Sequence, residues 1–404
     1  MRHLFRLILI VALLCPALSF AQPKSLPKFR MQEIDKTLTV GYCVILPDLN
    51  GDGKPDIVVA DSRRVIWFEN PAWTMHTILA GQTVPDNVSI DAIDITGDGK
   101  PDLVLGAGWK GYDTKAESTL QWLARGANVN EPWTMHPFGK EVDIHRIHVA
   151  DIEGSGKPQI YVAPLLGKGA TKDKNWMDAT PRFLEFVVPA DPMNGTWEPK
   201  VVTNALHVMH NFTPIHWKGE KQLSFLAASY EGVNLIQHNA DGSWKLTQIC
   251  AGNQDDPKAS RGTSEMKLGK GPGGQPFIAA IEPWHGNQVV VYTAPKSGDG
   301  LWDRHVLDDT FREGHALHVA DFDGDSVDEI LIGSRGKDDA AKITPTVNLY
   351  KLAGADLTKW DKHVLDGGGV AAEDIQIGDL NGDGKIDIVA VGRATHNVRI
   401  YWNE

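Results

Sequence analysis

Oxygen-bearing side chains at alternate positions of one short segment offer the clearest chemistry in this sequence. The segment from Asp48 to Asp56 reads Asp-Leu-Asn-Gly-Asp-Gly-Lys-Pro-Asp. Its first, third, fifth and ninth side chains and the carbonyl of Lys54 can converge on one cation, because the two glycines permit a tight backbone path. Ligation by oxygen alone suits Ca²⁺. For any single segment of this kind, an Asx-rich turn without an ion is the simpler alternative.

Recurrence of the segment favours calcium over that alternative. Further copies begin at Asp94, Asp151, Asp321 and Asp379. The copy at Asp151 has Ser155 and Gln159 in place of carboxylates, so it is predicted to keep the loop shape and lose the ion. We expect structural calcium at the four loops with complete ligand sets, namely Asp48, Asn50, Asp52 and Asp56; Asp94, Thr96, Asp98 and Asp102; Asp321, Asp323, Asp325 and Glu329; and Asp379, Asn381, Asp383 and Asp387.

The spacing of these loops and the apolar runs beside them predict the fold. Successive copies start 46, 57, 170 and 58 residues apart. A period of about 50 residues with several short strands is typical of a propeller blade. The longest interval has room for two more blades, which keep the strand-like segments Gln222–Gln237 and Pro276–Tyr292. The sequence therefore predicts an all-β, seven-bladed propeller that forms a single domain over residues 22–404.

A second recurring motif predicts the outermost strands and the way the ring closes. Trp-Thr-Met-His or Trp-Asp-(Arg/Lys)-His begins at Trp73, Trp133, Trp302 and Trp360. The segment 28–35 resembles such a strand but precedes the first unit, whereas the last unit stops near Trp402 without one. We expect the N-terminal segment to complete the last blade, because ring closure removes exposed sheet edges.

The first 21 residues have the features of a signal peptide. Arg2 and Arg6 precede the apolar run Leu7–Leu14, and Ser19–Ala21 supplies the small residues of a cleavage site. The apolar run is shorter than the about 20 residues that a membrane span needs. We therefore expect export to the periplasm or the extracellular space and no membrane span.

Charge and cysteine content narrow the classes of partner and the means of stabilisation. The net charge is −12, and cleavage of a segment containing Arg2 and Arg6 would make it −14, which excludes nucleic acid as a favoured partner. Cys43 and Cys250 fall in units that are not adjacent in a ring of seven. We expect no disulfide, so stability must come from packing and bound ions.

Ionisable residues recur where each unit enters the propeller axis. Six residues before the first Asp of the five clear loops lie Tyr42, Val88, His145, His315 and Glu373, and the comparable stretches of the other two units contain His207, His210, Arg261 and Glu265. His145, His210 and His315 would converge there and could ligate zinc or another divalent transition metal, with Glu373 or Glu265 as a fourth ligand.

The alternative for these histidines is an incidental cluster, since the chain has 15 of them. Four belong to the outer-strand motif and are interpreted as structural: His76, His136, His305 and His363. His148 and His318 lie three residues before their loop aspartates and are predicted to form hydrogen bonds between blades. Loops after the second strand of each unit should open on the face of the ring, where Trp109 and Trp284 could stack on sugar rings and Arg335 or Arg393 could hold an anion.

The loops and their flanking strands resemble FG-GAP or VCBS repeats, which form seven-bladed propellers of the integrin type and occur in many secreted bacterial proteins. The resemblance covers nearly all of residues 22–404. It implies the fold and the calcium loops, and leaves the activity open because such propellers serve adhesion, carbohydrate binding and lyase chemistry.

Two blocks, His315–Arg335 and Glu282–Tyr292, resemble the propeller part of aldos-2-ulose dehydratases and, more distantly, propeller-fold polysaccharide lyases. That resemblance implies metal-assisted β-elimination from a keto-sugar or uronide. Glu265 or His285 would take the proton, and Tyr230 or Arg335 would assist the leaving group or the oxyanion. The alternatives are a non-catalytic module that binds a glycan or a protein, and a structural or adhesive secreted protein. The oligomeric state is left open.

Overall fold

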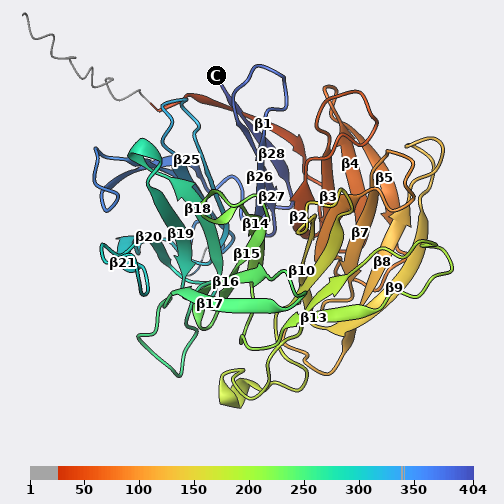
Figure 1. Cartoon of the computed structure of the whole chain (residues 1–404). Helices are drawn as coiled ribbons and strands as arrows, with labels where there is room; N and C mark the ends of the chain where they lie inside the picture. The colour runs from red at the N-terminus through yellow and green to blue at the C-terminus, as the bar shows by residue number, and fades with distance from the viewer. Residues whose placement is uncertain (1–25, 338–339, 341) are drawn as a thin grey trace, which may run out of the picture.

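Each unit of the sequence forms one antiparallel sheet of four strands. The computed structural model describes residues 26–337, 340 and 342–404, and its seven sheets follow one another around a central axis (Figure 1). The described residues contain no α-helix and only three single turns of 3₁₀-helix, Lys172–Lys174 (η1), Trp217–Gly219 (η2) and Pro272–Gly274 (η3). The predicted all-β, seven-bladed propeller is thereby confirmed. The predicted signal peptide lies outside the described residues.

The first three blades are built from strands in chain order, from the axis outward. Blade 1 contains β2 (Gly41–Ile45), β3 (Ile57–Asp61), β4 (Arg64–Glu69) and β5 (Thr74–Ala80). Blade 2 contains β6 (Ser89–Ile93), β7 (Asp102–Ala107), β8 (Glu117–Ala124) and β9 (Thr134–Val142). Blade 3 contains β10 (Ile144–Ala150), β11 (Gln159–Pro164), β12 (Phe183–Phe186) and β13 (Pro199–Thr203).

The two units that lack an acidic loop also form complete sheets. Blade 4 contains β14 (Asn211–Ile215), β15 (Ser224–Ser229), β16 (Gly232–His238) and β17 (Trp244–Cys250). Blade 5 contains β18 (Glu265–Lys270), β19 (Pro276–Glu282), β20 (Gln288–Thr293) and β21 (Asp303–Asp308). Blade 6 contains β22 (Gly314–Ala320), β23 (Glu329–Ser334), β24 (Thr346–Leu352) and β25 (Trp360–Gly367).

Blade 7 combines the two ends of the described chain. Its strands are β26 (Ala372–Gly378), β27 (Asp387–Gly392), β28 (Val398–Asn403) and, outermost, β1 (Phe29–Asp35). Phe29 lies opposite Asn403 and Arg30 opposite Trp402, and β1 runs beside β28 in Figure 1. The first strand therefore caps the sheet edge that β28 would otherwise expose.

Apolar side chains fill the space between neighbouring sheets. Between blades 1 and 2, for example, Val58, Trp67, Leu103 and Trp133 pack in one buried cluster. Burying a large apolar side chain contributes about 1.5–3 kcal/mol, so these faces hold the ring together. The outer-strand histidines support the packing: the ring of His76 stacks on Trp67 at 4.6 Å between centroids.

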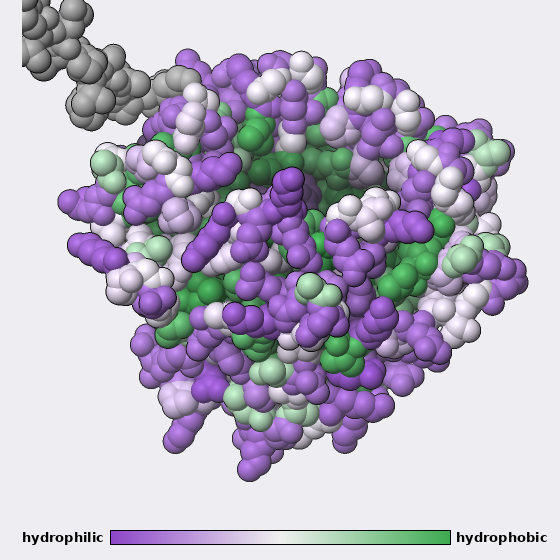
Figure 2. All heavy atoms as spheres, viewed as in Figure 1, coloured by the Kyte–Doolittle hydropathy of each residue, from purple (hydrophilic) through white to green (hydrophobic). Residues whose placement is uncertain are grey.

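The outer surface is largely hydrophilic. Figure 2 shows polar and charged residues over most of one face, with apolar side chains in the recesses between them. Among residues 26–337, 340 and 342–404, no helix has the length and apolarity to traverse a bilayer. Cys43 and Cys250 are both free thiols, as expected.

Candidate functional site

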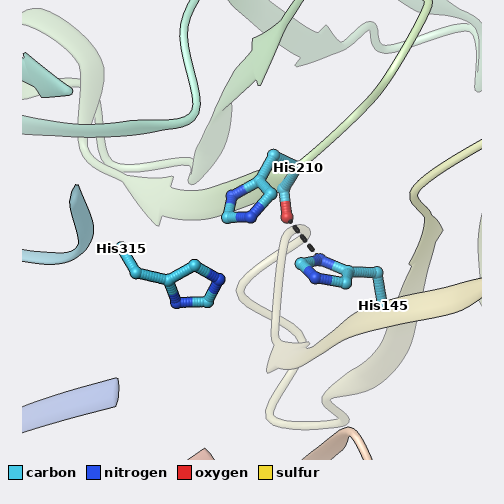
Figure 3. A group of neighbouring side chains, drawn as sticks. All are labelled: His145, His210 and His315. Carbon is cyan, nitrogen blue, oxygen red and sulfur yellow. Dashed lines mark hydrogen bonds between the residues drawn. The ribbon is translucent and has the colours of Figure 1, made fainter. Parts of the chain in front are cut away.

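Three histidines from three blades meet at the propeller axis. His145 lies in β10, His210 directly precedes β14 and His315 lies in β22, so each stands where an innermost strand begins. All three are buried, and one ring nitrogen from each lies within 4.8 Å of the others. Figure 3 shows the imidazoles pointing toward one another. The structure therefore brings together the three histidines that the repeat alignment selected.

Backbone carbonyls of the following blade fix the orientation of each ring. The Nδ1–H of His145 donates to the carbonyl of His210 at 2.9 Å, that of His210 to Ser264 at 3.0 Å, and that of His315 to Glu373 at 2.5 Å. A proton held on Nδ1 leaves the Nε2 lone pair free, as in imidazoles that ligate metals. Nε2 of His315 is buried without a hydrogen-bond partner.

His285 adds a fourth imidazole, and we refer to His145, His210, His285 and His315 together as the histidine cluster. His285 follows β19 in a left-handed conformation with φ of 50°, and its Nε2 lies 3.0 Å from Nε2 of His210. Arg335 donates to Nδ1 of His285 at 3.3 Å, so the Nε2–H of His285 donates to His210. Two ring nitrogens of a tetrahedral zinc site are separated by about 3.3 Å, for Zn–N distances of about 2.0 Å. A cation in place of that proton would fit between them.

Burial controls the charge of the cluster. It lowers the pKa of His145, His285 and His315 well below the ordinary value, and neighbouring Arg146 or Arg335 acts in the same direction. Burial also lowers the pKa of His210, although Glu265 opposes it. The imidazoles are therefore neutral near pH 7, which is the form that ligates metals.

Two buried acids flank the histidines. Glu265 in β18 accepts from Nδ1 of His210 at 3.1 Å and from the amide of Asn211 at 2.7 Å. Burial acts to raise the pKa of Glu265, but the hydrogen bond from His210 and the nearby charge of Arg146 lower it overall. This geometry is that of a group that orients a ligating imidazole.

The carboxylate of Glu373, predicted above as a possible fourth metal ligand, is bound by two arginines. Nη1 of Arg335 donates to both its carboxylate oxygens at 3.0 and 3.2 Å, and Nη1 of Arg393 donates to one of them at 3.0 Å. Oε1 of its carboxylate lies 3.9 Å from Nε2 of His315. Among the described residues, the group of converging ligand atoms contains the three histidines and not Glu373.

Aromatic side chains cover one side of the cluster. Trp284 packs against His285 with 4.8 Å between ring centroids, but it is only 6% exposed. Tyr230 lies behind it, is 1% exposed and donates its hydroxyl to Asn175, away from the histidines. Tyr112, which the sequence analysis missed, is 52% exposed and stacks on Trp176 at 5.7 Å. A ligand on this side would meet Tyr112 first.

Asp143 is a second residue that the sequence analysis missed. It lies two residues before His145, has φ of 50° and is 1% exposed. Neither carboxylate oxygen has a hydrogen-bond partner, and burial raises the pKa to about 7 although the indole of Trp109 and the Leu166 N–H favour the charged form. The sequence could have indicated it, because Asp143 lies two residues before His145 and side chains two positions apart lie on the same face of a strand.

A small chamber continues along the axis behind the histidines. It measures about 100 Å³, and its lining includes Arg146, His148, Lys267, His318 and Asp374. His148 donates from Nε2 to the Asn211 side chain at 3.3 Å, and His318 donates from Nε2 to the Ile375 carbonyl at 2.7 Å. Both bonds reach the neighbouring blade, as predicted for these two histidines.

The acidic loops form turns between the first and second strands of their blades. In the first copy, Asp48 accepts from the N–H groups of Gly51 and Gly53 at 2.8 and 2.9 Å, and the two glycines have φ of 81° and 86°. The altered copy keeps the same turn, since the Gly156 N–H donates to Asp151 at 2.6 Å. In the blade 6 loop, Asp321, Asp323 and Asp325 converge within 4.8 Å.

An ammonium group already lies among the carboxylates of the blade 6 loop. Nζ of Lys351 donates to Asp323, to Asp325 at 2.9 Å and to Glu329 at 3.2 Å. The Lys351 side chain is 13% exposed, so its charge lies close to the position where a bound cation would lie. Calcium at this loop would have to compete with Lys351 for the same carboxylates.

Comparison with known proteins supports both predicted resemblances. The model of the aldos-2-ulose dehydratase β-propeller domain matches residues 118–295, and that of the FG-GAP-like repeat matches residues 48–105. Aldos-2-ulose dehydratase of Phanerodontia chrysosporium is 26% identical over 265 residues, which cover 60% of this chain and 28% of that protein. The chain thus spans less than a third of the length of this curated relative.

Solved structures share the fold at low sequence identity. BBS1N in complex with ARL6DN has a TM-score of 0.55 at 13% identity in the lead-soaked crystal, with 94% of this chain and 97% of that chain covered. The mercury-soaked crystal gives a TM-score of 0.53 at 14% identity and the same coverage. At these identities the likeness supports the propeller architecture alone.

Proposed function

We propose that this protein is an exported, metal-dependent carbon–oxygen lyase that catalyses β-elimination on a keto-sugar or uronide at the histidine cluster. The observation that carries the proposal is the convergence of His145, His210 and His315 with each Nδ1 bonded to a backbone carbonyl. Imidazoles buried, neutral and oriented in this way suit zinc or another divalent transition metal. The match to a dehydratase propeller supports a sugar-derived substrate.

In the proposed reaction, Nε2 of His145, His210 and His315 would hold the metal, which when bound supplies a Lewis acid for a carbonyl or carboxyl oxygen. A base removes the proton from the adjacent carbon, that electron pair forms the new double bond, and the β-carbon–oxygen bond breaks. The leaving oxygen takes up a proton. Arg335, which contacts His285, would stabilise the negative charge that develops on the carbonyl oxygen.

The geometry favours His285 over Glu265 as the base. Glu265 is occupied by His210 and Asn211, whereas His285 lies on the side of the cluster that Trp284 and Arg335 border. Its low pKa keeps the ring neutral, and its lone pair lies on Nδ1, which Arg335 would have to release before His285 could take the proton. Tyr230 packs against Trp284 with 5.9 Å between ring centroids and donates its hydroxyl to Asn175, so Arg335 is favoured over it for assisting the leaving group or the oxyanion.

Structural calcium is the second part of the proposal. It is supported by the repeated oxygen-rich loops, whose turns keep Asp48, Asp94 and Asp379 at equivalent places. A non-catalytic glycan-binding propeller is the alternative, and the exposed ring of Tyr112 stacked on Trp176 favours it, because aromatic faces bind sugars without chemistry.

Metal analysis of the purified mature protein by plasma mass spectrometry tests the proposal. Wild type is compared with a His145→Ala/His315→Ala double variant and with His363→Ala, which removes an exposed outer-strand imidazole. We expect about one equivalent of zinc, manganese or iron in wild type and His363→Ala, and none in the double variant. Elimination products are then sought with keto-sugars and uronides. Calcium alone in all three proteins would contradict the metal site and favour the binding module.

A further inference from the structure

A cleft lined by cationic side chains opens beside the histidine cluster. It has a volume of about 630 Å³, and its lining includes Glu313, Arg335, Lys337, Arg393 and His396. This volume lies within the range of about 300–1,000 Å³ that is usual for small-molecule sites. Arg335 belongs to both features, since it lines the cleft and donates to Nδ1 of His285. The cleft and the histidine cluster are therefore neighbours that share Arg335.

The charge of the cleft is opposite to that of the protein. Among the residues that the structure describes, three fixed cations, Arg335, Lys337 and Arg393, line the cleft with one carboxylate, Glu313, whereas the whole chain carries a net charge of −12. The buried Glu373 beneath them accepts from both arginines. Glu373 and Glu313 together balance the charges of the two guanidinium groups, so the surplus positive charge of the described lining is that of Lys337.

The two arginines differ in their free donors. Arg335 uses all three nitrogens: Nε donates to Glu313 at 3.3 Å, Nη1 to Glu373 and Nη2 to His285. Arg393 donates from Nη1 to Glu373, and its guanidinium packs 5.5 Å from the ring of Tyr42. Its side chain is 35% exposed. The Nε and Nη2 edge of Arg393 can therefore receive an oxyanion through two parallel hydrogen bonds.

We infer that the ligand of this protein is a sugar bearing an oxyanion, a carboxylate or a phosphate, which Arg393 binds in the cleft while the sugar ring reaches the histidine cluster. The oxyanion site at Arg393 is independent of the proposed function. Only the placement of the reacting carbon at the histidine cluster rests on that function. A carboxylate in this place would narrow the substrate to a uronide, since neutralising that group by Arg393 and Arg335 makes removal of the adjacent proton easier.

Binding of three probes to the mature protein, measured by calorimetry, tests this inference. The probes are D-glucuronate, D-glucose and D-glucose 6-phosphate. We expect at least one charged probe to bind about tenfold or more tightly than D-glucose, because a charge-assisted hydrogen bond is lost with the neutral sugar. The preference should weaken at high salt. Tighter binding of glucuronate would identify a carboxylate, and tighter binding of the phosphate ester a phosphate.

Matched variants locate the effect. Arg393→Met should abolish the preference for the charged probe, and Arg393→Lys should restore part of it. Arg63→Met serves as the control, because Arg63 is an exposed arginine after the second strand of blade 1 and does not line the cleft. Glu373 keeps two hydrogen bonds from Arg335 in the Arg393 variants, so folding should survive, which the melting temperature checks.

The outcomes separate this inference from the proposed function. Binding of both charged probes no tighter than that of D-glucose, no binding of any probe, or an unchanged preference in Arg393→Met would overturn the inference. Metal content is measured on the same samples. A metal-free protein that still prefers the charged probe in an Arg393-dependent way would overturn the lyase proposal and leave the oxyanion site in place. A metal-loaded protein without any preference would do the reverse.

Discussion

Nε2 of His210 lies 3.0 Å from Nε2 of His285, although the two residues are 75 positions apart in the chain. His210 is fixed by a carbonyl on one side, and His285 is fixed by Arg335 on the other. The contact therefore joins the base of an innermost strand to a loop between a second and a third strand. It places a residue that can move a proton next to one that can hold a metal.

His285 should matter for chemistry more than for metal retention. If His145, His210 and His315 hold the metal, His285→Gln should keep wild-type metal content and lose activity by about 10²- to 10⁴-fold, which is the contribution of a positioned general base. Turnover of the best substrate and metal content are measured on one preparation. Loss of the metal together with activity would instead assign His285 to the coordination of the ion, as the 3.0 Å contact also allows.

Glu265 should set the metal affinity through His210. Glu265→Gln keeps the shape of the side chain but removes the negative charge that accepts from Nδ1 of His210. We expect metal affinity to fall by about 10- to 100-fold, measured by competition with a chelator. Glu153→Gln is the control, because Glu153 is 60% exposed and lies 3.9 Å from His238 on the surface. An unchanged affinity in Glu265→Gln would show that the Ser264 carbonyl alone orients the ring.

The sequence was sufficient for the fold because repetition multiplies a weak signal. One Asp-rich turn has several explanations, whereas copies beginning at Asp48, Asp94, Asp151, Asp321 and Asp379 with strands on either side have one architecture in common. His145, His210 and His315 could be selected for the same reason, since the equivalent position of every blade faces the axis.

The rest of the site depends on loops that do not repeat. The sequence predicts Trp284 to be an exposed aromatic residue, but Tyr112 and Tyr230 from other blades pack on it. The sequence suggests Glu373 as a metal ligand, whereas in the structure Arg335 and Arg393 bind its carboxylate. Such pairings bring together residues from different blades through loops of individual length, so period and residue type carry no information about them.

Asp308 should make stability depend on pH in the acid range. Although burial acts to raise its pKa, hydrogen bonds from Lys362, Thr310 and Tyr350 lower it to about 2. A depressed pKa means that the stabilisation is present above the unfolded value of about 3.9 and is lost as the pH falls toward 2. Asp308→Asn should cost about 2 kcal/mol at pH 7, and this cost should shrink between pH 4 and pH 2 in urea denaturation.

The control for this prediction is Asp299→Asn, since Asp299 lies on an exposed turn. That variant should follow the wild-type stability curve. A cost for Asp308→Asn that stays constant from pH 7 to pH 2 would show that packing with Tyr350 matters and the charge of the carboxylate does not.

Lys351 should determine whether the blade 6 loop needs calcium. Lys351→Met removes the ammonium that Asp323, Asp325 and Glu329 share, and leaves the partly buried carboxylates without a counter-charge. The charged form of Glu329 is already disfavoured, because burial and Asp323 raise its pKa to about 7 even with Lys351 present. In a chelating buffer we expect a loss of about 3 kcal/mol in the free energy of unfolding.

Calcium should reverse that loss in Lys351→Met, since a divalent cation can take the position of the ammonium among the same oxygens. Melting temperatures in chelator and in calcium give the comparison, with Lys54→Met as the matched variant. Nζ of Lys54 is 3.7 Å from Asp52 in the exposed loop of blade 1, so its removal should change stability little. If calcium leaves the melting temperature of both variants and of wild type unchanged, these loops are ion-free turns. Their aspartates would then only accept hydrogen bonds from the backbone N–H groups of the same loop.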